Sequence, residues 1–129
     1  MRITGDLYAW EDEKKPAVAQ FEVVAEMDQP DLSYEFNTFR VVRHKPSGRL
    51  FWGDSAGCSC PTPFEEYFFE VDGEQVVATD MNEITDATWD QFCKESAGFC
   101  EYESDYIKPV PVDERREFMA KVRAARSEV

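Results

Sequence analysis

This chain has little histidine, few glycines and no long hydrophobic run, and each shortage argues against a class of function. His44 is the only histidine, and the sequence contains no His-Glu-x-x-His motif, no Gly-x-Ser-x-Gly motif and no phosphate-binding glycine loop. No apolar stretch approaches the roughly 18 residues needed to cross a bilayer. The first residues lack the apolar centre of a secretory signal. We therefore expect a cytoplasmic protein without membrane contact, and we favour a non-enzymatic function.

What the chain does contain is enough apolar surface for one folded domain. Its 129 residues fall within the usual size of a single domain, which we place at 1–129. Ten Phe, five Tyr and three Trp supply large side chains for a core. This composition argues against intrinsic disorder.

The charge of the chain is strongly negative and unevenly distributed. The formal net charge is −13, and residues 50–107 carry fourteen acids against one base, Lys94. A solvated surface is the simplest explanation of this excess. The alternative is an acidic face that repels nucleic acids and membranes and attracts basic partners.

The N-terminal part of the chain is predicted to be mainly β. Residues 1–16 form a loosely ordered lead-in, and 17–80 are mainly β. Apolar residues alternate up to Met27, which indicates a strand with one apolar exception. A hairpin follows over residues 34–53, with Lys45-Pro46-Ser47-Gly48 as its turn, and a second hairpin over 66–79 turns at Asp72-Gly73.

Residues 85–127 are predicted to be mainly helical. Thr85 or Asp86 caps a helix over 87–96, with Gly98 as its stop signal. Asp113 caps a second helix that ends near Arg126. The fold class is therefore α+β: an antiparallel sheet of about four to five strands, built from two hairpins, with two helices in the C-terminal half.

Four cysteines form the candidate metal site. Cys58, Cys60, Cys93 and Cys100 offer four thiolate ligands, the set that structural zinc commonly takes. Against zinc, the first pair has one intervening residue and the second pair six, and a helix would place Cys93 in an apolar stripe. Ordinary thiols are favoured, so we expect no cofactor, with zinc as the alternative. A disulfide between Cys58 and Cys60 would be strained, and no base lies near in the sequence to activate either thiol.

Basic and aromatic residues alternate along the first hairpin in a pattern that stacking on nucleic acid bases would use. The bases are Arg40, Arg43, His44, Lys45 and Arg49. Strand alternation sends them to the solvent face, and the acidic middle of the chain offers them ion-pair partners. His44 is expected to face solvent. Direct nucleic acid binding is therefore not expected.

The segment Gly57 to Glu66 concentrates two cysteines and two prolines in ten residues. With the preceding hairpin, its Gly-Cys-Ser-Cys-Pro-x-Pro-Phe-Glu sequence resembles a family of small proteins encoded by bacteriophages of actinobacteria. That family is grouped as a domain of unknown function, and the resemblance covers about residues 17–67. It implies a phage protein working in a bacterial cytoplasm, and it brings no catalytic residues.

These observations lead to two hypotheses about function. The first is a non-enzymatic phage accessory protein that binds a host or phage protein, in one version as an acidic inhibitor or nucleic acid mimic. Its contact surface would be the acidic segment together with an interaction loop of Cys58, Ser59, Cys60, Pro61, Thr62, Pro63, Phe64 and Glu65. The alternative is a small structural zinc-binding domain that uses the cysteine loop.

Overall fold

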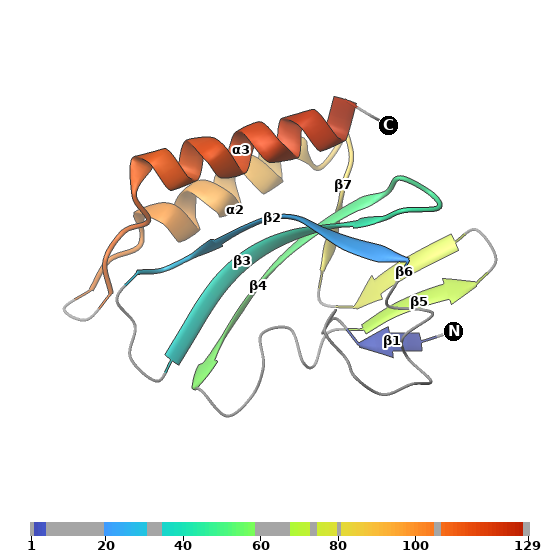
Figure 1. The fold of residues 1–129 in the computed structure, drawn as a ribbon, viewed down its shortest axis with the longest axis horizontal. Coiled ribbons are helices and arrows are strands. Elements are labelled where there is room, and N and C mark those ends of the chain that lie inside the picture. Colours follow the sequence, from blue (N-terminus) through green and yellow to red (C-terminus); the bar gives the residue numbers. More distant parts are fainter. Residues whose placement is uncertain are drawn as a thin grey trace.

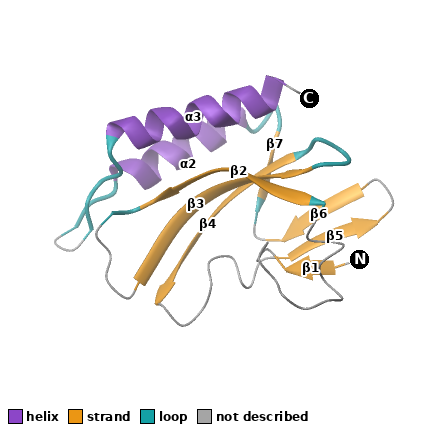
Figure 2. Cartoon of the chain, in the orientation of Figure 1, coloured by secondary structure: helices purple, strands orange, loops and turns teal. Residues whose placement is uncertain are grey.

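Over the residues that the structure describes, the chain forms two antiparallel sheets and two helices (Figures 1 and 2). The computed structural model describes residues 2–4, 20–30, 35–58, 68–72, 75–79, 81–104 and 107–127. A four-stranded sheet has the order β2-β3-β4-β7, and a three-stranded sheet has the order β1-β5-β6. Both helices lie on one side of the four-stranded sheet, as Figure 1 shows. The α+β class is confirmed.

The four-stranded sheet is built on the predicted first hairpin, which is confirmed. Strand β3 (Glu35–His44) pairs with β4 (Leu50–Cys58), and the turn between them places Gly48 at φ 74°, a conformation that favours glycine. Strand β2 (Phe21–Asp28) pairs with the other side of β3. The fourth strand, β7 (Asn82–Ile84), was not predicted, and it pairs with the start of β4.

Strand β2 contains an irregularity at the residue that broke its alternating pattern. The register with β3 shifts between Val23 and Ala25, so Val24 is an extra residue in the strand. Phe21 consequently shares a face with His44, whereas Ala25 and Met27 share the opposite face with the core residues that the helices cover. The apolar residues of this one strand therefore lie on both faces of the sheet.

The second predicted hairpin is also present, but it belongs to the separate small sheet. Strand β5 (Phe68–Asp72) pairs with β6 (Gln75–Thr79). On its other side β5 pairs with β1 (Arg2–Thr4), a strand inside the expected lead-in. The prediction of one sheet built from both hairpins was therefore wrong. The second hairpin forms a sheet with β1, and the first forms a sheet with β2 and β7.

Helix α2 begins and ends at other residues than predicted, whereas α3 ends near Arg126 as predicted and differs at its start. Helix α2 spans Trp89–Glu101, and its N-cap is Thr88, not Thr85 or Asp86. It continues through Gly98 because the residues that follow pack inward, as described below. Helix α3 spans Val112–Ser127, so Asp113 lies in its first turn and is not its cap.

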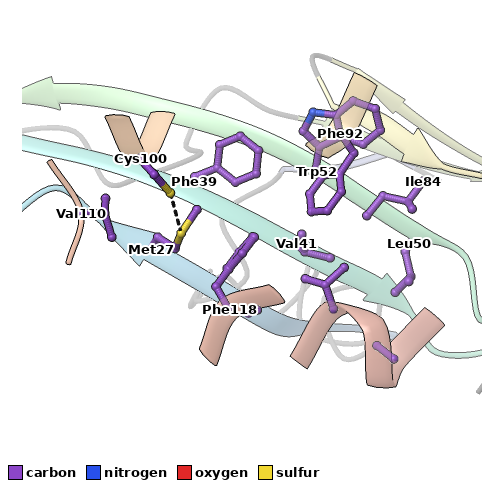
Figure 3. Packing of buried hydrophobic residues seen from close by; sticks show 13 residues of the cluster. Met27, Phe39, Val41, Leu50, Trp52, Ile84, Phe92, Cys100, Val110 and Phe118 are labelled. Atoms are coloured by element: carbon purple, nitrogen blue, oxygen red, sulfur yellow. Dashed lines mark hydrogen bonds between the residues drawn. The ribbon is translucent and has the colours of Figure 1, made fainter. Parts of the chain in front are cut away.

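The core lies between the two helices and the sheet face that they cover (Figure 3). Phe92 of α2 is fully buried, with its ring centroid 5.6 Å from that of Trp52 on β4. Phe39 of β3 packs between the helices, 5.5 Å from Phe99 and 5.8 Å from Phe118. Aromatic packing of this kind adds to the burial energy and fixes how the helices sit on the sheet.

Candidate functional site

Of the predicted interaction loop, Cys58 to Glu65, the structure describes only the first residue. Cys58 is the last residue of β4, and its backbone lies opposite Glu35 of β3. The rest of the predicted interaction loop, Ser59 to Glu65, lies outside the described residues, and so does Cys60. Strand β4 therefore runs past Gly53, where the sequence predicted its end, and includes Cys58. The role of the loop in binding stays a prediction.

The other two predicted metal ligands, Cys93 and Cys100, lie on α2 and face helix α3. Cys93 and Cys100 are seven residues apart, which is about 10.5 Å along a helix axis, whereas two sulfurs on one zinc are each about 2.3 Å from it. The Cys100 sulfur lies 3.3 Å from the Met27 sulfur in the buried core (Figure 3). Within the described residues no group of three or more His, Cys, Asp or Glu side chains could hold a metal ion.

Burial makes Cys100 a poor nucleophile. Loss of hydration raises the pKa of its thiol, and the guanidinium of Arg115 lowers that pKa by less. A raised pKa leaves less thiolate at neutral pH, and the thiolate is the reactive form. Cys100 therefore acts as a small apolar residue of the core.

The arginines of the first hairpin form ion pairs with carboxylates of the same chain. Arg40 is only 5% exposed and pairs with Glu26 at 3.0 Å. Arg43 pairs with Glu22 on β2, and Arg49 pairs with Glu83 on β7. Solvent exposure of Arg40 was wrongly predicted, because the sheet buries both of its faces. Among the described residues, β2 supplies the partners of Arg40 and Arg43, and Glu83, from the acidic middle of the chain, is the partner of Arg49.

His44 is buried, which corrects the expected solvent-facing position. It is 2% exposed, and its ring nitrogens lie 2.7 Å from the Ser47 hydroxyl and 3.2 Å from the Gln20 side-chain oxygen. Burial first, and the positive charge of Arg49 second, lower the pKa of His44. The residue is therefore a neutral structural element at the turn end of the hairpin.

An acidic groove runs along the outer edge of β2, beneath α3. We define it by its lining: Glu26 and Asp28 of β2, with Glu114, Glu117, Phe118 and Lys121 of α3. Its volume is about 380 Å³, and the buried apolar side chain of Phe118 forms its floor. Four carboxylates and one ammonium group line this space, so the groove attracts cations.

A second cavity of about 360 Å³ lies where α2 passes over the ends of β3 and β4. Buried Gln29 and half-buried Asn37 form part of its wall: the Asn37 amide donates to the Gln29 side-chain oxygen at 2.7 Å, and Gln29 donates to the Phe99 carbonyl at 3.4 Å. Glu95 and the exposed ring of Tyr102 are also on its wall. This cavity is polar and mildly acidic, and the amide pair is already satisfied internally.

A family of proteins with a domain of unknown function, DUF7574, matches the chain over residues 11–108. The matched part is about three quarters of the chain. The chain belongs to this family. No curated protein and no solved structure matches it significantly. Within the described part of the chain, no helix is both long and apolar enough to span a bilayer.

The DUF7574 match contains β2 and α2 but ends before α3. The β2 wall of the acidic groove is therefore inside the family region, and its α3 wall is outside. Counting charges by segment did not find the groove, because its acids lie before residue 50 and after residue 107, where acids and bases nearly balance. A usable signal was the spacing of Glu26 and Asp28, two residues apart on one strand face, and of Glu114 and Glu117, one turn apart on a helix.

Proposed function

We propose that this DUF7574 protein is a non-enzymatic bacteriophage accessory protein that acts in the host cytoplasm by binding a basic surface of a host or phage protein. The observation that carries the proposal is a difference in ion pairing between the basic and the acidic side chains. The arginines of the first hairpin have carboxylate partners within the chain. Exposed carboxylates such as Glu95, Glu103 and Glu114 have no ion-pair partner among the described residues.

Uncompensated surface carboxylates raise the net negative charge and act on partners over about 8–10 Å at ordinary ionic strength. They increase the rate of encounter with a basic surface and exclude acidic ones. The resemblance to phage proteins supports the setting, and the shortage of histidine and of catalytic motifs supports a binding function. The interaction loop from Cys58 to Glu65 is the second part of the proposed contact surface.

A nucleic acid mimic is a special case of this proposal. It would need carboxylates in two spaced rows, and the acids of residues 50–107 are one possible source of them. The acidic groove offers acids on two opposite walls, from β2 and α3, so the special case is better tested there. Its partner would be a DNA-binding protein, and duplex DNA would compete with the chain for that partner.

The test is affinity capture from host lysate with the immobilised full-length chain at about 50 and about 500 mM salt. The matched variant reverses the four exposed acids Glu95, Glu103, Glu114 and Glu117 to lysine, which changes the net charge from −13 to −5. We expect one partner that is retained at low salt, released at high salt and lost with the variant. Equal recovery by both proteins, or no partner at either salt concentration, would contradict the proposal.

The interaction loop is tested separately by replacing Pro61-Thr62-Pro63-Phe64 with glycine and serine. The loop proposal predicts weaker capture of the same partner at low salt. Unchanged capture would remove the loop from the contact surface and leave the acidic surface in place.

A further inference from the structure

Within the described residues, the outer edge of β2 carries backbone groups that no other strand pairs with, and their positions are known. Among the described strands β2 pairs only with β3. The Gln29 N–H donates to the Asn37 carbonyl of β3 at 3.0 Å. Backbone groups of successive residues in a strand point to opposite sides, so Ala25 and Met27 also turn theirs toward β3. Glu26 and Asp28 therefore present their N–H and C=O groups to the outer edge.

The acidic groove lies along this same edge. The side chains of Glu26 and Asp28 belong to the sheet face away from the helices, where they contact Arg40 and Thr38. Glu114 and Glu117 come from α3, on the opposite face. A single space lined by residues of β2 and of α3 therefore reaches the outer edge of the strand. The groove is therefore open at the backbone groups of Glu26 and Asp28.

The charge of the groove is only partly neutralised. Glu26 pairs with Arg40, and Glu117 pairs with Lys121 at 3.1 Å. Asp28 accepts a hydrogen bond from Thr38 at 2.5 Å but has no cation within ion-pair distance among the described residues, and the same holds for Glu114. An occupant that brings positive charge fits this groove, whereas an acidic or purely apolar one does not.

We infer that the outer edge of β2 binds an extended basic segment of the partner protein as an additional strand. Its backbone pairs with the outward groups of Glu26 and Asp28, and its lysines or arginines meet the carboxylates of the acidic groove. This inference rests on the proposed function, and it names the chemistry and position of one contact.

Two features limit how long the added strand can be. The extra residue at Val24 twists the edge and interrupts regular pairing on one side. Pro30 follows directly after Gln29 on the other side and has no N–H to donate. Pairing is therefore restricted to about residues 25–28, so binding is weak without the charges and sensitive to salt.

A second copy of this chain does not fit the same edge. Antiparallel pairing of two β2 edges within residues 25–28 would place Glu26 of one copy against Asp28 of the other. Like charges directly opposite one another destabilise a sheet. The occupant is therefore a basic segment of another protein.

The test uses the full-length chain and a ten-residue peptide of alternating lysine and valine, blocked at both ends. The first control peptide replaces lysine with glutamate. The second keeps the lysines but carries N-methyl groups on two adjacent central residues, which removes one donor from each edge of the peptide. NMR amide exchange reports on each backbone N–H of β2.

We expect the lysine peptide to slow exchange of the Glu26 and Asp28 amides about tenfold or more, because those N–H groups gain acceptors. The Met27 amide, already bonded to β3, should not change. The N-methylated peptide should bind about tenfold more weakly, and the glutamate peptide should not bind.

A pair of variants with equal net charge separates the groove from general electrostatics. Glu114→Lys with Glu117→Lys changes the groove, whereas Glu95→Lys with Glu103→Lys changes α2 and the residues after it, and each pair takes the chain from −13 to −9. All four positions are exposed, so both variants should fold, which far-UV circular dichroism checks. The groove pair should weaken the lysine peptide about tenfold and the control pair less than about threefold.

The outcomes distinguish this inference from the proposed function. Salt-dependent binding that leaves Glu26 and Asp28 unprotected, or that tolerates N-methylation, overturns the strand inference and leaves an acidic binding surface elsewhere. Equal weakening by both variant pairs overturns it too. If neither the peptide nor a lysate partner binds, the proposed function fails with it.

Discussion

Replacing Gly98 with alanine should stabilise the protein. The residue lies inside α2, which continues to Glu101, and a Cβ built at this position would meet no atom within 4 Å. Glycine in a helix interior is less stable than alanine by roughly 0.5–1 kcal/mol, because the unfolded chain loses more backbone freedom on folding. For a domain of this size that gain raises the melting temperature by about 2–5 °C.

The sign of this effect tests where the helix ends. If Gly98 were the left-handed residue after the helix, as its sequence position indicated, alanine would instead destabilise the fold by about 1 kcal/mol. Gly48 provides the matched control, because its φ of 74° is in the left-handed region and Gly48→Ala should destabilise by about 1 kcal/mol. Urea and thermal unfolding of both variants give the comparison. A loss of stability in Gly98→Ala would refute the helical assignment.

Three further predictions follow from buried groups. The free energy of unfolding should fall as the pH drops below about 6.5, because the lowered pKa of His44 keeps it neutral in the folded state while the unfolded state takes up a proton. In urea titrations at several pH values, His44→Gln should lack this part of the pH dependence. Phe92→Ala should cost about 3–5 kcal/mol in urea unfolding, and a loss under about 1.5 kcal/mol would contradict its central packing. Protein purified without added metal should contain less than about a tenth of an equivalent of zinc by elemental analysis, since Cys93 and Cys100 are two turns apart; a full equivalent would restore the zinc alternative.

The sequence predicted elements that depend on neighbouring residues and missed those that depend on distant ones. The first hairpin has its turn residues and strand residues in one continuous segment, so local preference determines it. Strand β7 is three residues long and forms only because β4 offers an edge. The last turn of α2 forms in spite of Gly98, because Phe99 packs on Phe39 and Cys100 on Met27, contacts that span more than fifty residues.

The candidate site was less predictable than the fold for the same reason. Charge counts along the chain singled out residues 50–107, but the acidic groove joins Glu26 and Asp28 to Glu114 and Glu117. Only the packing of α3 over β2 brings these pairs together. The burial of His44 depends in part on the extra residue at Val24, which turns Phe21 toward it. An alternating pattern read without that residue assigns the first half of β2 to the wrong face.

The folding unit is longer than the DUF7574 match at both ends, and this affects how binding must be tested. Strand β1 precedes the matched residues 11–108 and pairs with β5 inside them. Helix α3 follows them and places Phe118, Val122 and Ala125 in the core. Without α3, the helix-covered face of β2 and β3 would expose apolar side chains to water, which favours aggregation. The same helix supplies two of the four carboxylates of the acidic groove, so a fragment limited to the matched residues would lose the fold and the proposed contact together.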